Sequence, residues 1–141
     1  MSDKCFLDTN ILVYAFMPVD PRRHRIARGL LHDGLKDGTA VISWQVVQEF
    51  LNVALRKNSS ELDPTTLADA IRVILLPLCK VWPSPDLWHD ALRIHRQTGY
   101  GFYDSLVVAG ALMSGARRLL SEDLQHGRLL GELRIENPFA E

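Results

Sequence analysis

The chain has 141 residues, of which 47% are hydrophobic and 23% are charged, and its formal net charge is −1. This size and composition are ordinary for a globular domain with its own core, and no apolar run is long enough to span a bilayer. The near-neutral charge excludes a strong overall attraction to nucleic acid, so any polyanion binding must depend on local patches or bound metal ions.

The first half of the chain reads as short apolar strands separated by capped helices. Asp20-Pro21 is a typical helix start, with the aspartate as cap and the proline in the first turn. The expected elements are, in chain order, a strand at 4–7, a helix at 11–16, a helix from Asp20-Pro21 to about residue 35, a strand at 40–42, and a helix at 44–57 capped by Ser43 and ended by Asn58-Ser59-Ser60.

The second half continues the alternation. The expected elements are a helix from Asp63-Pro64 through Leu75, a strand at 79–81, a turn at "PSPD", helices at 87–97 and 102–113, and strands at 118–120 and 133–135. Short apolar strands alternating with helices predict an α/β fold with a mostly parallel sheet. We find no repeat or linker and expect a single domain over residues 1–141, in a cytoplasmic protein because the N-terminus lacks the layout of a secretion signal.

Two acids follow predicted strands, at the sheet edge where open parallel sheets bind ligands. Asp8 follows the first strand and Asp123 follows the fourth. Each has a purely structural alternative. Asp8 could cap the helix that begins near residue 11, and Asp123 could be a first-turn acid behind a Ser121 cap.

Asp104 and Glu49 differ in how strongly the pattern marks them. Asp104 is the only charged residue between Arg96 and Arg117, and a helical wheel places it among valines and alanines. An unpaired carboxylate on such a surface needs compensation, which a bound cation would provide. Glu49 lies on the polar stripe of its helix, so the pattern alone indicates a solvated surface acid.

Four short segments, in this order, resemble the PIN domain family, and most strongly its VapC-type ribonuclease toxins of type II toxin–antitoxin modules. The segments are "FLDTNILVYAF", "VVQEFLNV", "YDSLVVAGAL" and "LLSEDLQHG". The resemblance implies a three-layer α/β/α fold with a parallel sheet of about five strands. It implies that Asp8, Glu49, Asp104 and Asp123 converge as catalytic and metal-binding residues, supported by Asn10 and Ser121.

The chemistry of such an acidic site can be argued from charge. Carboxylates repel an RNA phosphate, so the cluster makes sense only with divalent cations bound. Oxygen-only ligands favour Mg²⁺, with Mn²⁺ as a substitute, and such ions can activate water for phosphodiester hydrolysis. We therefore expect an endoribonuclease that leaves a 5′-phosphate and a 3′-hydroxyl. The prediction requires the carboxylate oxygens to lie within reach of a shared ion.

The expected partners are an RNA substrate and, from the resemblance, a cognate antitoxin whose tail covers the acidic site and a second copy in a homodimer; no membrane partner is expected. Arg22, Arg25 and Arg28 lie close together on one helix and could contact RNA phosphates, or they could form a solvated helix face. Cys5 and Cys79 are expected to be buried free thiols. The tryptophans are expected in the core or an interface, and His126 is the histidine nearest the acids in sequence.

Two other functions stay open at this stage. A phosphatase or receiver-like domain could use Asp8 as phosphoryl acceptor, although Asn10 occupies the place where such sites usually have a second acid. A non-catalytic PIN-like module could bind RNA or a protein partner, although it would have no need to keep four acids together.

Overall fold

The computed structural model describes residues 3–57 and 62–141, so the expected break at Asn58-Ser59-Ser60 lies outside the described residues. In chain order the elements are β1 (Cys5–Leu7), α1 (Thr9–Phe16), α2 (Pro21–Asp37), β2 (Ala40–Ser43), α3 (Trp44–Arg56), α4 (Pro64–Ala70), a π-helical turn (Ile71–Leu75), α5 (Leu76–Leu78), β3 (Cys79–Val81), α6 (Pro85–Thr98), α7 (Phe102–Met113), β4 (Arg118–Leu120), β5 (Leu129–Leu130) and β6 (Leu133–Glu136).

The strands form one six-stranded sheet in the order β3-β2-β1-β4-β6-β5. All neighbouring strands are parallel except β5, which pairs antiparallel with β6. The expected α/β fold is therefore confirmed, with β5 as an added strand. A two-residue strand has no periodicity to detect, which is why the sequence pattern does not show it.

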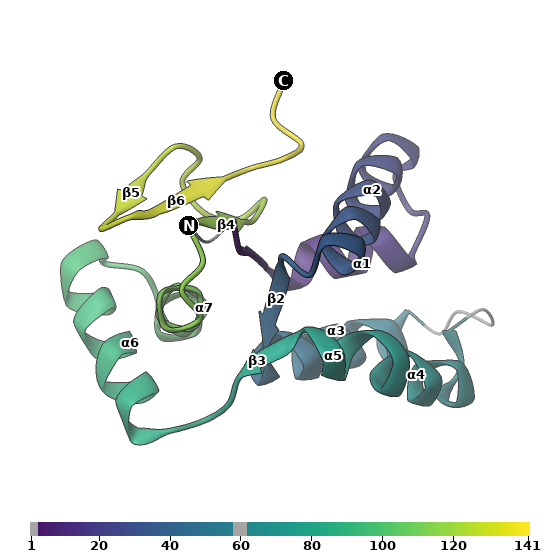
Figure 1. Ribbon diagram of the computed structural model, residues 1–141, viewed down its shortest axis with the longest axis horizontal. Coiled ribbons are helices and arrows are strands. Elements are labelled where there is room, and N and C mark those ends of the chain that lie inside the picture. The colour runs from purple at the N-terminus through teal and green to yellow at the C-terminus, as the bar shows by residue number, and fades with distance from the viewer. Residues whose placement is uncertain (1–2, 58–61) are drawn as a thin grey trace.

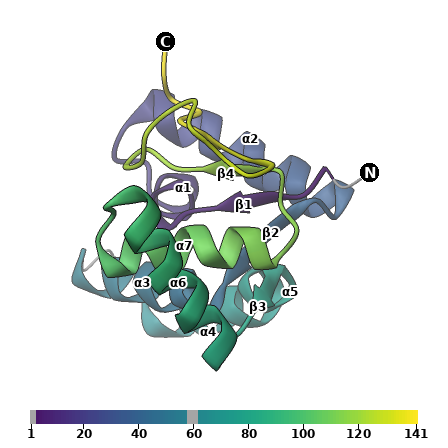
Figure 2. The same cartoon turned by 90° about the vertical axis from the view of Figure 1, so that its left-hand side faces the viewer.

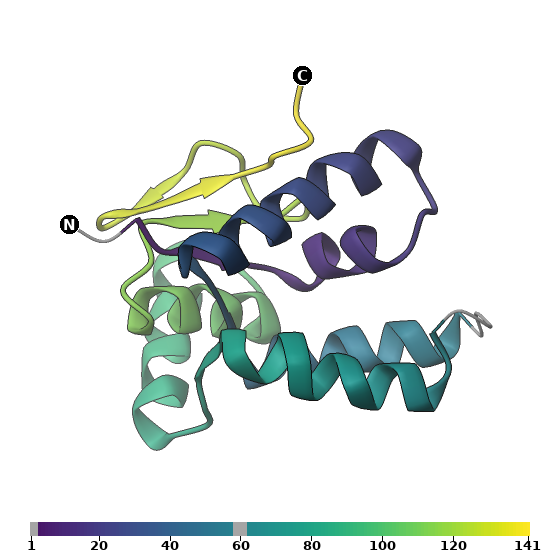
Figure 3. The ribbon, with the colours of Figure 1, turned by 45° about the vertical axis from the view of Figure 1, so that its right-hand side comes forward.

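Helices cover both faces of the sheet. Figure 1 shows α1 and α2 on one side of the central strands and α6 and α7 on the other. The view in Figure 2 agrees, with α6 and α7 in front of the strands and α2 behind them. Figure 3 shows α3 running alongside α4 and α5 at the β3 end of the sheet. The layers bury β1 and β2 completely, as is typical of parallel strands.

Several helix starts follow from local chemistry, as expected. The carboxylate of Asp20 accepts a hydrogen bond from the Arg23 amide, and that of Asp63 accepts one from the Thr66 amide. The Ser43 hydroxyl likewise caps α3. Each bond satisfies an amide that has no partner within its own helix.

Several helix boundaries differ from expectation. The expected helix at 11–16 begins at Thr9, because Asp8 caps it directly, and α6 begins at Pro85 behind a Ser84 cap. The helix expected to end at Leu75 continues to Leu78 through a wider π-type turn. Pro77 lacks an amide hydrogen, and the wider turn just before it accommodates that loss.

One glycine is required by the close packing of α2 on β2. A Cβ atom built on Gly34 would lie 2.4 Å from the Ala40 Cβ. This contact brings the C-terminal end of α2 against the sheet, where Gly38 then ends the helix with a left-handed φ of 71°. The two cysteines are free and buried, as expected. None of the described helices combines the length and apolar character needed to cross a membrane.

Candidate active site

The strand order reverses beside β1, and this reversal brings two distant acidic segments together. The chain proceeds from β1 outward through β2 to β3, then returns to place β4 on the other side of β1. The Asp8 amide donates to the Leu120 carbonyl at 3.0 Å, which joins the carboxyl ends of the two strands. Asp8 and the 121–123 segment thus meet at the kind of crevice where open α/β sheets bind ligands.

Asp8 is buried, with only 8% of its surface exposed. Its Oδ1 accepts from the Thr9 amide at 2.8 Å, and its Oδ2 accepts from the Ser121 hydroxyl at 2.7 Å. Burial raises the pKa of Asp8 to about 6; the two hydrogen bonds oppose this rise, and the nearby charges of Glu49 and Asp123 add to it. Asp8 therefore caps α1 and is also part of the acidic group.

Ser121 and Asn10 connect Asp8 to Asp123. The fully buried Ser121 hydroxyl donates to Asp8 and accepts from the Asp123 amide at 3.1 Å. The Asn10 side-chain amide donates to Asp123 Oδ2 at 3.1 Å, and its carbonyl oxygen accepts from the Glu122 amide at 3.3 Å. These bonds join α1 to the segment after β4.

Asp123 does not lie in a helix. The structural alternative, in which Asp123 is a first-turn helix acid behind a Ser121 cap, is therefore wrong. Residues 121–128 form bends and turns, and Asp123 is exposed. Its place is set by Asn10 and Ser121 instead, because their side chains bond its carboxylate and its amide.

Glu49 reaches the same region from α3. Its Oε1 accepts from Gln45 Nε2 at 2.9 Å, and the same nitrogen donates to the Tyr103 carbonyl at 3.2 Å. Burial, followed by the charge of Asp104, raises the pKa of Glu49. Gln45 lies on the same polar stripe of α3 as Glu49, a pattern that indicates a solvated side chain, but it is buried where its amide bonds to the Tyr103 carbonyl of α7. On a helix, a glutamine four residues before a glutamate lies on the same face as that glutamate. This spacing is the sequence signal that could have identified Gln45 as a partner of Glu49.

Asp104 is exposed in the first turn of α7, which corrects the expectation that it lies on a covered apolar surface. Its neighbours Ser105 to Ala111 are buried, so the apolar pattern is real, but the carboxylate lies at the open end of that helix. Partial desolvation, followed by the charge of Asp123, still raises the pKa of Asp104.

The four acids lie near enough for their charges to act on one another in pairs. The charges of Glu49 and Asp123 raise the pKa of Asp8, that of Asp104 raises the pKa of Glu49, and that of Asp123 raises the pKa of Asp104. Within residues 3–57 and 62–141, however, no group of three or more His, Cys, Asp or Glu side chains is close enough to hold a metal ion. The four carboxylates thus share one region, but the expectation that they all lie within reach of one shared ion is not met among the described residues.

This donor set fits a hard, hydrated dication. All four side chains offer oxygen, and burial together with neighbouring negative charge raises the pKa of Asp8, Glu49 and Asp104, a cost that a bound cation would relieve. Mg²⁺ usually keeps several waters and binds one or two carboxylates, so it does not need three converging acids. A zinc site would need closer nitrogen or sulfur ligands, which the described residues do not supply here.

A second layer of contacts, which the sequence analysis missed, holds the segment after β4 in place. Glu122 accepts from the Tyr14 hydroxyl at 2.9 Å and pairs with Arg23 at 2.5 Å. Arg23 also pairs with Asp20 and lies over the rings of Tyr14 and Phe139. Since Glu122 directly precedes Asp123, this cluster restrains the acidic segment from the side of α2.

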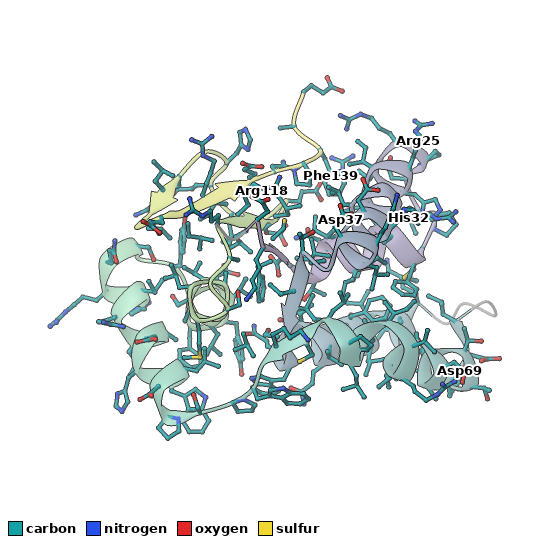
Figure 4. The ribbon with its side chains drawn as sticks, in the orientation of Figure 1. Arg25, His32, Asp37, Asp69, Arg118 and Phe139 are labelled. Atoms are coloured by element: carbon teal, nitrogen blue, oxygen red, sulfur yellow. The ribbon has the colours of Figure 1, made fainter. Side chains whose placement is uncertain are left out.

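The basic helix face is only partly free. Arg22 donates to the Phe139 carbonyl at 2.9 Å, and Phe139 lies beside α2 in Figure 4. Arg25 and Arg28 are exposed, and Figure 4 shows Arg25 extending away from the strands. RNA contact by the three arginines stays a prediction, with Arg22 already bonded within the chain.

The remaining aromatic and histidine residues are placed as follows. Trp44 packs against the core, as expected, whereas Trp82 and Trp88 are exposed and do not belong to it. Trp82 directly follows the edge strand β3, and Trp88 lies on α6. The local sequence pattern cannot distinguish these exposed positions from covered ones. The exposed His126 accepts a hydrogen bond from the Asn137 amide through Nδ1.

Comparison with known proteins places these features in a family. The model of the PIN domain family matches residues 5–129. The curated ribonuclease VapC23 of Mycobacterium tuberculosis is 29% identical over 122 residues, which cover 84% of this chain and 91% of that protein. A toxin–antitoxin complex from Klebsiella pneumoniae superposes with a TM-score of 0.69 at 15% identity, covering 96% of this chain and 98% of that one. The sarcin–ricin loop cleaving toxin VapC20 of M. tuberculosis superposes with a TM-score of 0.61 at 19% identity, covering 85% and 92%.

Proposed function

The chain belongs to the PIN domain family, and we propose that it is a Mg²⁺- or Mn²⁺-dependent endoribonuclease that acts as the toxin of a type II toxin–antitoxin module. The proposal rests on one observation above the others. Four carboxylates from distant parts of the chain share one region at the switch point of the sheet, around the buried Asp8. A ribonuclease name on a relative that spans 84% of this chain supports the same reaction class.

The roles of the residues follow from their contacts. Asp8 is held rigidly by Thr9 and Ser121, and its carboxylate keeps lone pairs beyond those two bonds. Asp8, Glu49, Asp104 and Asp123 would hold the cation, directly or through its waters. When bound, Mg²⁺ or Mn²⁺ supplies water activation and charge neutralisation at the phosphate. Asn10 and Ser121 act as supporting residues because they orient Asp123 and Asp8.

The proposed partners are an RNA substrate, a cognate antitoxin and a second copy of the chain. A toxin–antitoxin complex among the similar structures supports the antitoxin. An antitoxin segment over the acidic region would block RNA, so protein binding would restrain the activity. The homodimer comes from the family resemblance.

The test is cleavage of RNA by purified wild-type protein with Mg²⁺, compared with Asp8→Asn and with wild type in chelator. Wild type should generate new 5′-phosphate ends at defined positions, and both controls should abolish them. Cleavage by Asp8→Asn at the wild-type rate would contradict the proposal. RNA binding without cleavage by the metal-loaded wild type would favour the non-catalytic PIN-like module instead.

The arginine face has its own test. Because phosphate contacts are independent of sequence, Arg25→Ala with Arg28→Ala should weaken RNA binding across sequences and flatten its dependence on salt. If the affinity for RNA and its dependence on salt are both unchanged, these arginines form a solvated helix face.

A further inference from the structure

A pocket of about 350 Å³ opens directly beside the acidic residues. It lies between the first turns of α3 and of α7, and Glu49 is both one of its lining residues and one of the four acids. The lining residues are Trp44, Gln45, Gln48, Glu49, Tyr103 and Leu106. Its volume is at the lower end of the range for small-molecule sites, which suits one flat ring system.

The walls of the pocket are aromatic and apolar. Tyr103 is 70% exposed, so its ring faces solvent at the rim, and the buried Leu106 lies one helical turn further along α7. Trp44 forms another part of the lining. Exposed aromatic rings beside a site of phosphodiester hydrolysis are platforms on which unpaired bases stack. Such stacking is tolerant of base identity.

Trp44 is half-buried, and it both lines the pocket and packs against the core. Its Nε1 is buried and has no acceptor in the part of the chain that the structure describes. A buried donor without a partner is a cost that phenylalanine would avoid.

Two amide side chains give the pocket polar edges. Both partners of Gln45 Nε2 are acceptors, namely Glu49 Oε1 and the Tyr103 carbonyl, so the orientation of this amide is set. Its Oε1 has no donor among the described residues and is left as an acceptor. The exposed Gln48 side chain makes no hydrogen bond to any other residue that the structure describes. Amide groups of this kind pair with the donor and acceptor edges of bases.

Gln45 also links the pocket to the acids. Its amide bonds one acid directly and bonds the backbone of the residue that precedes Asp104. A base in the pocket would thus lie next to two of the four carboxylates, with its attached phosphate within the acidic region.

We infer that this pocket binds one unpaired RNA nucleobase next to the scissile phosphate and so sets base preference. The inference rests on the proposed ribonuclease function and deepens it, because it names where sequence is read. The acids position the phosphate, the rings of Tyr103 and Trp44 stack the base, and Gln45 and Gln48 read its edge.

Binding measurements on a non-cleaving chain test the inference. In the Asp8→Asn background with Mg²⁺, affinity is measured for the four RNA homotetramers and for a tetramer of ribose phosphate without bases. Tyr103→Ala should weaken binding of the base-bearing tetramers by about tenfold or more, the value of one base–aromatic stack, and leave the abasic tetramer unaffected. Gln48→Ala should change the ranking of the four bases.

Matched variants separate the pocket from general effects. Trp88→Ala removes a ring that is 48% exposed on α6 and does not line the pocket. It should therefore change neither the affinity for base-bearing tetramers nor the affinity for the abasic tetramer. Tyr103→Phe keeps the ring and should keep the affinity. The inference is overturned if Tyr103→Ala weakens the binding of base-bearing and abasic tetramers equally. It is also overturned if Tyr103→Ala weakens the binding of neither, a result that would favour a protein partner as the occupant of the pocket.

The two proposals can fail separately. If the wild type cleaves RNA and Tyr103→Ala cleaves it with the same base preference, the inference about the base-binding pocket is wrong, whereas the proposed ribonuclease function is supported. The opposite outcome is that the wild type cleaves no RNA, while the Asp8→Asn chain binds base-bearing tetramers more tightly than abasic ones and loses this difference with Tyr103→Ala. In that case the proposed ribonuclease function is wrong and the base-binding pocket is supported.

Discussion

Replacing Asp8 by asparagine should remove activity and at the same time stabilise the fold. At neutral pH the buried Asp8 is ionised at a cost, because its pKa lies near 6 in the folded protein against an ordinary value of 3.8. At roughly 1.36 kcal/mol per pH unit, this difference corresponds to about 3 kcal/mol of lost stability. Asparagine keeps an oxygen for the Thr9 amide and carries no charge to bury.

The sign of the pH dependence follows from proton binding. Below about pH 4, Asp8 is protonated in both the folded and the unfolded state and costs nothing. Between about pH 4 and 6 the unfolded chain loses its proton first, so the free energy of unfolding of the wild type falls as pH rises. Above pH 6 the full cost applies, and the advantage of Asp8→Asn reaches its maximum.

Thermal unfolding followed by circular dichroism, with chelator present, measures the effect at pH 4 and pH 7.5. Asp8→Asn should melt about 6–12 °C above wild type at pH 7.5 and close to it at pH 4. Asp33→Asn is the control, since its carboxylate is 77% exposed on α2 and its loss should change stability by less than about 0.5 kcal/mol. If Asp8→Asn melts at or below the wild-type temperature at pH 7.5 while Asp33→Asn is neutral, the reasoning about Asp8 burial is wrong.

Three further outcomes are expected. Mg²⁺ should raise the melting temperature of wild type but hardly that of Asp104→Asn, and equal shifts in a melting assay would count against a cation at the four acids. Asn10→Ala removes the 3.1 Å bond to Asp123 and should lower the rate of RNA cleavage with little change in melting temperature; an unchanged rate would remove its supporting role. Gly34→Ala should destabilise the fold by about 1–3 kcal/mol in chemical denaturation, because its methyl would meet the Ala40 Cβ at 2.4 Å, and a neutral result would show that α2 can shift away.

The features that could be predicted from sequence are mostly local. Asp20, Ser43 and Asp63 each bond an amide three residues ahead, so the helix starts are visible in a few consecutive letters. The alternation of apolar strands and helices is likewise a short-range pattern, and it indicated the α/β class. Failures came where a short element or a covering helix decided the outcome, as at β5 and at Gln45.

The amino-acid sequence by itself determined which carboxylates exist, which of them follow strands, and which helices begin with a cap, because those properties depend on neighbours within a few residues. Only the tertiary structure decided that Asp8 is buried against Ser121, 113 positions away, and that Glu122 is held by Tyr14 and Arg23. The physical reason is that desolvation and charge coupling depend on distance in space, and the reversal of strand order beside β1 sets that distance.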